Sequence, residues 1–557
     1  MCDFARSRHS CTSIFSNALR LSEQVTKMPV RQADTPATDD ELKQAAIDGA
    51  TKRILRQQPI NPMDTIACRL YPSLSFFFDG TNNNMERDQP LNKHSNVAKL
   101  FQTAVASTQQ EARPTYLPGV GTPFKFEKVA GYTDHLKDDD GGVLGLGFGV
   151  GGELRINFAL GEFSRLLEIE WGPATWKHMR EITIAIFGFS RGATEARAFA
   201  RRLIALKCLK DSGHLYWQAP SGIRVLLRIN FMGIFDTVAS VGGPALHLDW
   251  ASELAIPAEV ERCLHYVSAH EVRRAFPLDS VRIDKTYPGN CEEVVYPGVH
   301  SDVGGGYGPG EQGRDQDLSI IPLRHMFAEA LRAGVPLMRF DELEPKYRED
   351  FQLDDNARIT KLYTDYLSAL PAPSSDDLES LIHPHRHLNF RWRSILSRHN
   401  ADERVLGHLY EKVGAAFCAS IPAGTNEDHP TCQPNEWVYD VPKDPEQQAR
   451  QLLREQRRLE RRIEFLRNPI ESHAGNRSYP PQPRELRPYE KKILAAWDEA
   501  GTIPLAVDQL LAEYIHESVA AFTSWPCALW EQRGIYCDGT RYLAQNDPVG
   551  PSDAAVA

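Results

Sequence analysis

A serine between two glycines is the strongest chemical signal in the sequence. Gly188-Phe189-Ser190-Arg191-Gly192 has the pattern G-x-S-x-G, which in serine hydrolases places a nucleophile on a sharp turn between a strand and a helix. Residues 181–187 (EITIAIF) are β-branched and apolar, and residues 191–204 (RGATEARAFARRLI) have helical spacing. A serine hydroxyl is a poor nucleophile until a neighbouring base takes its proton, so the motif predicts Ser190 as nucleophile with an acid and a base elsewhere. The alternative is an ordinary loop with a serine N-cap.

The predicted acid is Asp236, which directly follows the apolar run 225–235 (VLLRINFMGIF). An acid that follows the serine by one helix and one strand reaches the same edge of a sheet, and the order Ser, Asp, His is typical of this kind of hydrolase. Asp249, Asp279 and Asp284 do not directly end a strong apolar run. Capping of the next segment is the structural alternative for Asp236.

The predicted base is His300, in the glycine-rich segment 297–307 (PGVHSDVGGGY). A catalytic imidazole needs a loop that can reach across the sheet edge, and glycines give that freedom. His247, His265 and His270 are rivals, and the last two are expected in a helix over 259–276. Asp302, two residues after His300, is the alternative acid.

Acyl transfer also needs two N–H donors for the tetrahedral oxyanion. The amide of Arg191, directly after the nucleophile, is the predicted first donor. The second is predicted at Gly80 or Thr81, in the loop 78–84 (FDGTNNN) that follows the apolar run 74–78 (LSFFF). The structural alternative is a tight turn in which Asp and Asn side chains bond their own backbone.

These motifs follow apolar runs that alternate with helical stretches, with EVVY at 293–296 before His300. This pattern favours an α/β fold with a mainly parallel sheet covered by helices on both faces. In such folds the catalytic residues lie at the carboxyl ends of the strands. We expect a polar N-terminal segment over 1–65, in which Met28 is an alternative start, a catalytic domain over 66–335, and a mostly helical region over 336–557. Further helices are predicted at 41–56, 153–167, 444–467 and 490–516, with a linker at 468–488.

Composition limits the function classes. The chain has 557 residues, a formal net charge of −11 and 42% apolar residues, which is typical of a soluble globular protein. The acidic balance disfavours a nucleic-acid binder. No apolar run is long enough to span a membrane, and the first residues lack the apolar core of a Sec signal. The ten cysteines form no C-x-x-C pair, which favours thiols of a protein made in a reducing cytoplasm, and no metal or organic cofactor is expected.

Two weaker patterns are assigned structural roles. Gly147, Gly149 and Gly152 satisfy G-x-G-x-x-G, but no strand precedes them, so a flexible segment before a helix is favoured over nucleotide binding. The helix predicted at 447–467 is rich in arginine and amphipathic, a pattern found in helices that lie on anionic membranes. Its glutamates dilute the charge, so a helix docked on the protein is favoured.

Five segments resemble the first Tle family of type VI secretion lipase effectors. They are FFFDGTNNN (76–84), YLPGVGT (116–122), IFGFSRGATEARAFA (186–200), GIFDTVAS (233–240) and GVHSDVGGGYG (298–308). The resemblance implies an α/β-hydrolase-like phospholipase with the triad Ser190, Asp236 and His300, hydrolysing glycerophospholipid esters as phospholipase A1 or A2. It also implies cytoplasmic production, delivery by a VgrG-type spike into the periplasm of a competitor, and a cognate immunity protein.

Two other functions stay open at this point. The same fold serves soluble esterases or thioesterases with no membrane role, and activity on short esters without activity on vesicles would identify one. An inert binding module would fail to react with a fluorophosphonate probe.

Overall fold

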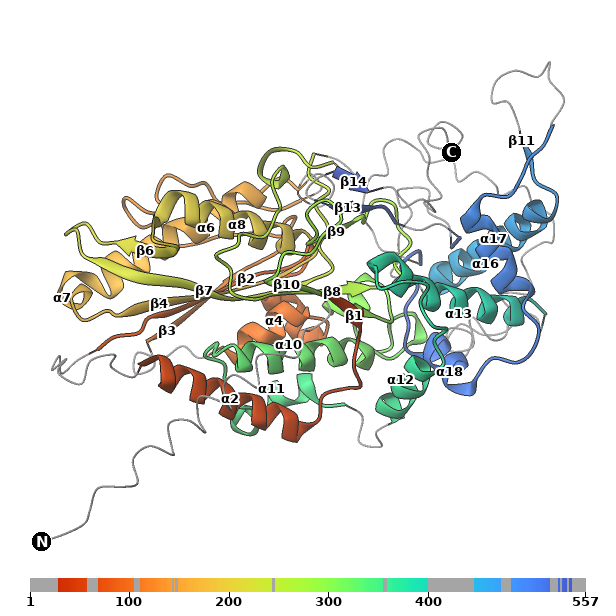
Figure 1. Ribbon diagram of the computed structural model, residues 1–557, viewed down its shortest axis with the longest axis horizontal. Coiled ribbons are helices and arrows are strands. Elements are labelled where there is room, and N and C mark those ends of the chain that lie inside the picture. Colours follow the sequence, from red (N-terminus) through yellow and green to blue (C-terminus); the bar gives the residue numbers. More distant parts are fainter. Residues whose placement is uncertain are drawn as a thin grey trace, which may run out of the picture.

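A parallel sheet forms the centre of the protein (Figure 1). The computed structural model describes residues 29–57, 69–104, 111–142, 145, 149–242, 246–353, 358–398, 445–471, 482–520, 529–530, 533–537 and 540–542. The main path of the sheet runs β1-β10-β8-β7-β4-β2-β3, and every pairing along it is parallel. β6 pairs antiparallel with β7, and β5 with β6. The strands are β1 Val30–Gln32, β2 Ser73–Phe78, β3 Ala112–Leu117, β4 Glu181–Phe189, β5 Leu209–Asp211, β6 His214–Gln218, β7 Arg224–Phe235, β8 Cys263–Ser268 and β10 Cys291–Tyr296.

Both faces of the sheet are covered because its central strands are apolar on both sides. Along β4, Ala185, Phe187 and Phe189 belong to one buried cluster, while Ile184 and Ile186 belong to another. The first cluster packs under α2 Asp39–Gln57, α4 Asn96–Thr103 and α10 Ile320–Arg332, and the second under α6 Gly152–Arg165 and α8 Arg191–Lys207 (Figure 1). This two-sided burial explains the continuous apolar runs of the sequence. The predicted α/β architecture is confirmed.

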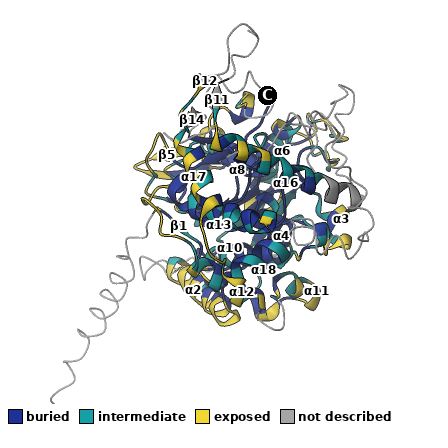
Figure 2. Ribbon diagram, turned by 90° about the vertical axis from the view of Figure 1, so that its right-hand side faces the viewer, coloured by how far each residue is buried: buried dark blue, intermediate teal, exposed yellow. Residues whose placement is uncertain are grey.

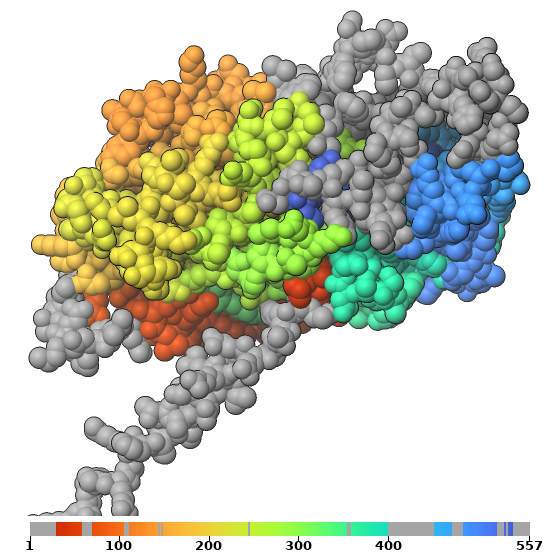
Figure 3. All heavy atoms as spheres, turned by 45° about the horizontal axis from the view of Figure 1, so that its top comes forward, coloured from red at the N-terminus to blue at the C-terminus, as the bar shows by residue number. Residues whose placement is uncertain are grey.

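The C-terminal region is largely helical, as predicted, and lies against one end of the sheet (Figure 1). Figure 2 looks from that side, with α13 and α17 in front of the sheet. In Figure 3 the C-terminal region, coloured from turquoise to blue, lies at the opposite end from the yellow segment that holds β5 and β6. The helices of this region are α12 Arg358–Ser368, α13 Leu378–Arg398, α16 Pro445–Arg467, α17 Pro488–Asp498 and α18 Leu505–Glu513. The basic helix α16 buries Leu459, Ile463 and Leu466, so it is docked on the protein.

Short elements complete the fold. The helices are α3 Met85–Asp88, α7 Gly172–Trp176, α9 His300–Gly304 and α11 Pro345–Arg348, and α6 continues as a π-helix at Leu166–Glu170. β13 Ile535–Cys537 lies between β9 Leu278–Ser280 and β14 Thr540–Tyr542, while β11 Ile470–Glu471 pairs with β12 Gln482–Pro483. No helix within the described ranges combines the length and the hydropathy that a membrane crossing needs.

Three expectations differ from the structure. The helix predicted at 259–276 is wrong, because residues 263–268 form the strand β8. The side chains of CLHYVS point alternately to the two faces of the sheet, and all six are buried because both faces are covered. The helix predicted at 490–516 is two helices, α17 and α18, because Gly501 and Pro504 interrupt it. Residues 30–57, expected outside the catalytic domain, contribute β1 to its sheet and pack α2 on α10. Met28 and Gly147 lie outside the described residues.

Candidate active site

Ser190 occupies a sharp turn between β4 and α8. Its backbone has φ +56° and ψ −125°, a conformation that residues other than glycine rarely adopt. Both flanking glycines are needed for close approach. A Cβ on Gly188 would lie 2.6 Å from the Cα of Ala193, and a Cβ on Gly192 would lie 2.2 Å from the carbonyl oxygen of Asp79. The turn therefore has the strain and the tight packing of a nucleophile elbow.

Asp236 lies at the end of the neighbouring strand. Phe189 of β4 pairs with Phe235 of β7, so Ser190 and Asp236 come directly after paired residues, and the amide of Ser190 donates to the carbonyl of Phe235 at 3.0 Å. The Asp236 carboxylate accepts hydrogen bonds from the amide of Ser268 at 2.8 Å and from its hydroxyl at 3.1 Å. Asp236 is fully buried and has φ +39°, so its carboxylate is held firmly at the sheet edge.

His300 begins α9, after β10, and its ring reaches Asp236. The Nδ1 atom lies 2.6 Å from Oδ2 of Asp236. The rings of Phe189 and Phe276 pack on the imidazole with centroid distances of 4.7 and 5.1 Å. A proton on Nδ1 donated to Asp236 makes Nε2 the basic nitrogen. The Ser190 hydroxyl makes no hydrogen bond to a described residue, and in ligand-free enzymes the serine–histidine contact is often long.

The electrostatics of this pair suit a carboxylate beside a neutral imidazole. Burial by itself raises the pKa of Asp236, but the Arg533 guanidinium and His300 outweigh it and hold that pKa well below its usual range. Burial lowers the pKa of His300 from its ordinary 6.5, and Asp236 offsets only part of that effect. Asp236 is therefore ionised and His300 neutral near pH 7, which is the state in which an imidazole can accept a proton.

The alternative acid, Asp302, is directed elsewhere. Its Oδ1 lies 2.7 Å from Nδ1 of His516, and its Oδ2 accepts the amides of Val299 and His516. Asp236, and not Asp302, therefore makes the hydrogen bond to His300.

The rival histidines are also engaged. His247 pairs with Asp279 at 2.5 Å, and the fully buried His265 contacts Glu293 at 2.8 Å and accepts the amide of Thr237. His270 accepts the amide of Gly298. Each of these rings has a structural partner, which agrees with the preference for His300.

The loop 79–84 lies against the serine turn, as the oxyanion prediction requires. Nε of Arg191 donates to the Thr81 hydroxyl at 2.6 Å, which ties this loop to the first residue of α8. The amide of Gly80, however, donates to the carboxylate of Asp79 at 2.7 Å. Its N–H is thus already committed, and Thr81 is the better candidate of the two. The Arg191 amide belongs to the first turn of α8, where amides lack an acceptor within the helix.

The segment 116–122 supports the same loop. The Tyr116 hydroxyl donates to Asp79 at 2.5 Å, and the amide of Gly119 donates to the carbonyl of Asn83 at 2.9 Å. A Cβ on Gly119 would lie 1.7 Å from the carbonyl oxygen of Gly80. This explains why YLPGVGT accompanies FFFDGTNNN: the glycine lets two loop backbones touch.

Arg533 contacts the candidate acid, and nothing in the sequence indicates this contact. Its two terminal nitrogens each lie 2.6 Å from one carboxylate oxygen of Asp236, and one of them also donates to the carbonyl of Ser268 at 3.0 Å. Arg533 precedes β13, whose pairing with β9 holds this part of the chain beside the site. No motif surrounds it, and no local signal connects two residues almost 300 positions apart.

Comparison with known families identifies the catalytic region. Residues 73–214 and 220–329 match the family described as "T6SS, Phospholipase effector Tle1-like, catalytic domain". This region is a Tle1-like catalytic domain. The match spans all five sequence segments that suggested the resemblance, and it contains Ser190, Asp236 and His300. This match covers somewhat less than half of the chain, and it agrees with the predicted resemblance to type VI secretion phospholipase effectors.

One solved structure extends the likeness of fold beyond the residues that match the Tle1-like domain. An uncharacterized protein from Pseudomonas aeruginosa aligns with a TM-score of 0.62 and 22% identity over 91% of this chain and 85% of that one. A second structure, of the Tle1 effector bound to the VgrG spike from the type VI secretion system, aligns with a TM-score of 0.32 and 18% identity, over 57% of this chain and 84% of that one. No curated protein matches the chain.

Proposed function

We propose that this protein is a serine phospholipase that hydrolyses acyl esters of membrane glycerophospholipids through Ser190, His300 and Asp236. The observation that carries the proposal is the 2.6 Å contact between Asp236 and His300 at the strand end beside the strained Ser190 turn. The Tle1-like domain supports the substrate class, because its family is one of phospholipase effectors.

The first half of the reaction forms an acyl-enzyme. Nε2 of His300 takes the proton of the Ser190 hydroxyl, and Oγ attacks the ester carbonyl. The Arg191 amide, with Thr81 as the second donor, stabilises the oxyanion. The tetrahedral intermediate then expels the lysolipid alkoxide, which receives the proton from His300. Asp236 keeps the imidazole oriented and stabilises its charged form.

The second half uses water as the nucleophile. His300 takes a proton from water, the hydroxide attacks the acyl carbonyl, and Ser190 leaves with the proton returned by His300. The products are a fatty acid and a lysophospholipid. None of these steps needs a metal ion or an organic cofactor.

The biological setting follows from the same family. We propose that the protein is made in the cytoplasm, carried by a VgrG-type spike into the periplasm of a competing bacterium, and neutralised in the producing cell by an immunity protein. Its substrate is the phospholipid membrane of the target cell.

The decisive test is product analysis on a phospholipid with two different acyl chains. Mass spectrometry should show release of fatty acid and lysolipid by the native protein and none by Ser190→Ala, and the released chain assigns A1 or A2 specificity. Hydrolysis of short soluble esters without hydrolysis of vesicles would replace the phospholipase with a soluble esterase. Retained activity of Ser190→Ala would exclude Ser190 as nucleophile.

A further inference from the structure

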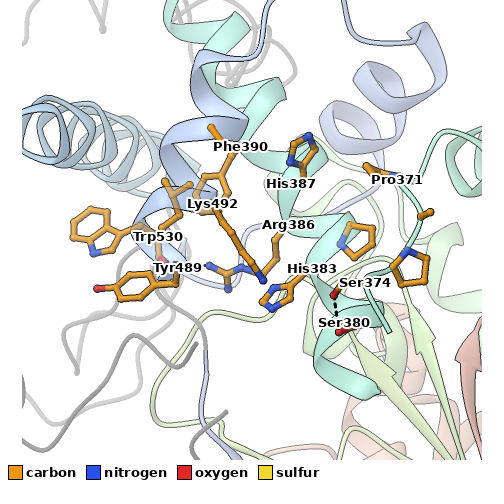
Figure 4. Close-up of a pocket in the computed structure, with 15 residues that line it drawn as sticks. Pro371, Ser374, Ser380, His383, Arg386, His387, Phe390, Tyr489, Lys492 and Trp530 are labelled. Atoms are coloured by element: carbon orange, nitrogen blue, oxygen red, sulfur yellow. Dashed lines mark hydrogen bonds between the residues drawn. The ribbon is translucent and has the colours of Figure 1, made fainter. Parts of the chain in front are cut away.

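A pocket lies in the C-terminal region, between α13 and α17. The pocket has a volume of about 280 Å³, and Ser190, Asp236 and His300 are not among its lining residues. Figure 4 shows three aromatic side chains, Phe390, Tyr489 and Trp530, around it. These rings supply apolar walls of the kind that hold small organic ligands.

The charge of this pocket is one-sided. The side chains of Arg386 and Lys492 extend toward the same region beside His383 (Figure 4), and none of the described lining residues is Asp or Glu. The Lys492 side chain is exposed and makes no ion pair within the described ranges, while Arg386 donates to the carbonyl of Trp530 at 3.2 Å. Arg386 and Lys492 therefore bring two positive charges to the same side of the pocket, which favours an anionic ligand there.

The pKa of His383 is affected by the same two positive charges. Burial, together with the neighbouring charges of Lys492 and Arg386, lowers the pKa of His383 from its ordinary 6.5 to about 4. The ring is therefore neutral near pH 7, so the permanent positive charges of the pocket are those of Arg386 and Lys492.

We propose that this pocket binds a single-chain anionic amphiphile, a long-chain carboxylate whose head lies at Arg386 and Lys492 and whose chain lies against Phe390, Tyr489 and Trp530. The small volume favours one hydrocarbon chain over a two-chain phospholipid. Identification of this ligand with the fatty acid that the enzyme releases rests on the proposed function, whereas the binding chemistry does not.

The test is direct binding to full-length protein with Ser190→Ala, which separates binding from turnover. Isothermal calorimetry at pH 7.5 with dodecanoate below its micelle concentration should give saturable one-to-one binding. Dodecanol, which lacks the charge, and inorganic phosphate, which lacks the chain, should each bind at least about tenfold more weakly. Equal affinity for dodecanol would overturn the anionic site, and binding to phosphatidylglycerol vesicles without binding to dodecanoate would replace it with a lipid surface.

Matched variants locate the site. Lys492→Gln should weaken dodecanoate binding about fivefold, which corresponds to the loss of one partly exposed charge interaction. Ala495→Asp, at an exposed lining position, should abolish binding by adding a carboxylate. Lys491→Gln is the control, because Lys491 is equally exposed on α17 and does not line the pocket. Unchanged affinity of the first two variants, or equal loss in the control, would overturn the assignment.

A separate observation concerns Arg533. Its two-pronged contact with Asp236 is buried on both sides, with Arg533 4% and Asp236 0% exposed. Because the carboxylate also meets His300, the guanidinium fixes which oxygen faces the imidazole. From this geometry we infer that Arg533 is a positioning residue that acts on the reaction through Asp236.

Other charged groups near His300 also influence its pKa, so they must be considered when Arg533 is replaced. The Glu271 carboxylate accepts the amide of His300 at 3.3 Å and pairs with Arg273. Removal of Arg533 takes one positive charge from this group and leaves Asp236 less screened, so the imidazolium of His300 becomes more stable. The expected signature is a shift of the acidic limb of kcat/KM to higher pH.

The experiment compares Arg533→Gln, Arg533→Lys and Arg282→Gln. Arg533→Gln should lower kcat at least about tenfold and shift the acidic limb upward, and Arg533→Lys should recover part of both. Arg282→Gln is the structural control, because Arg282 makes a similar buried two-pronged contact with Glu379. An unshifted pH profile in folded Arg533→Gln, or the same profile change in Arg282→Gln, would overturn the positioning role.

Discussion

Two buried aspartate–histidine pairs each contribute one residue to α9, His300 and Asp302, and have different surroundings. Asp236 meets His300 at 2.6 Å, and Asp302 meets His516 at 2.7 Å, in both cases through Nδ1. The ring of His300 packs on Phe189, the residue before the serine, whereas the ring of His516 stacks on Tyr307 at 3.9 Å. In the second pair, Nε2 is buried and has no partner among the described residues.

The difference shows that the hydrogen bond between carboxylate and imidazole does not identify a catalytic pair. The first pair joins the end of β7 to α9 beside a strained serine turn, and the second joins α9 to the segment after α18. The proposed catalytic pair is the one beside Ser190, because an imidazole can act as a base only toward a hydroxyl that its free nitrogen can reach.

The largest effect is expected from removing the Ser190 hydroxyl, which lies beside the Asp236–His300 pair and is the proposed nucleophile. Ser190→Ala should lower phospholipid hydrolysis by about 10³- to 10⁶-fold, because the residual rate comes only from binding and oxyanion stabilisation. Circular dichroism should show a fold unchanged from the native protein. A variant with more than a few per cent of native activity would contradict the assignment.

The next test exchanges the two acids. Asp236→Asn should lower kcat by about 10³- to 10⁴-fold, because the amide favours the wrong tautomer of His300. Asp302→Asn should leave kcat of the folded enzyme within about tenfold and destabilise the protein by about 1–3 kcal/mol, since it weakens buried hydrogen bonds to His516 and Val299. Steady-state kinetics and thermal melts of both variants measure the contrast. The reverse ranking of kcat would move the acid to Asp302.

A smaller effect is expected from pH. Since burial lowers the pKa of His300 below 6.5, the neutral base persists into mildly acidic solution. The acidic limb of kcat/KM should therefore have its midpoint below pH 6.5, with activity lost as pH falls and His300 gains a proton. Rates on micellar substrate between pH 4.5 and 8.5 check this, and a midpoint above pH 7 would contradict it.

The smallest effect concerns stability near the site. Burial raises the pKa of Glu195 on α8 to about 8, although Arg155 and Arg191 oppose the shift, and neither carboxylate oxygen has a hydrogen-bond partner among the described residues. The neutral form is favoured in the folded protein, so its stabilising contribution is complete below the unfolded pKa near 4.5 and is lost as pH rises through 8. Glu195→Gln should therefore lose less stability than the native protein between pH 5 and 9, by a few degrees in Tm. An equal fall in Tm from pH 5 to pH 9 in Glu195→Gln and in the native protein would contradict the raised pKa of Glu195.

Much of the site could be predicted because its signals are local. The buried strands appear in the sequence as apolar runs. The candidate catalytic residues Ser190 and Asp236 directly follow such runs, and His300 lies in a glycine-rich turn after another. β8 could not be predicted, because six residues that are buried on both faces of a sheet show no clear hydrophobic period. The sequence leaves Gly80 and Thr81 as alternative donors, since only the structure reveals that the Gly80 amide donates to Asp79. Arg533 and His516 could not be found, since their roles depend on contacts across 200 or more positions.

The pairing of β13 with β9 has a consequence for synthesis. A ribosome delivers Ser190, Asp236 and His300 well before Arg533, the residue that neutralises the buried carboxylate. A nascent chain that ends before residue 533 therefore holds an uncompensated charge where the finished protein holds an ion pair. On the proposed mechanism, chains that end before residue 533 should therefore hydrolyse phospholipid more slowly than chains that contain it.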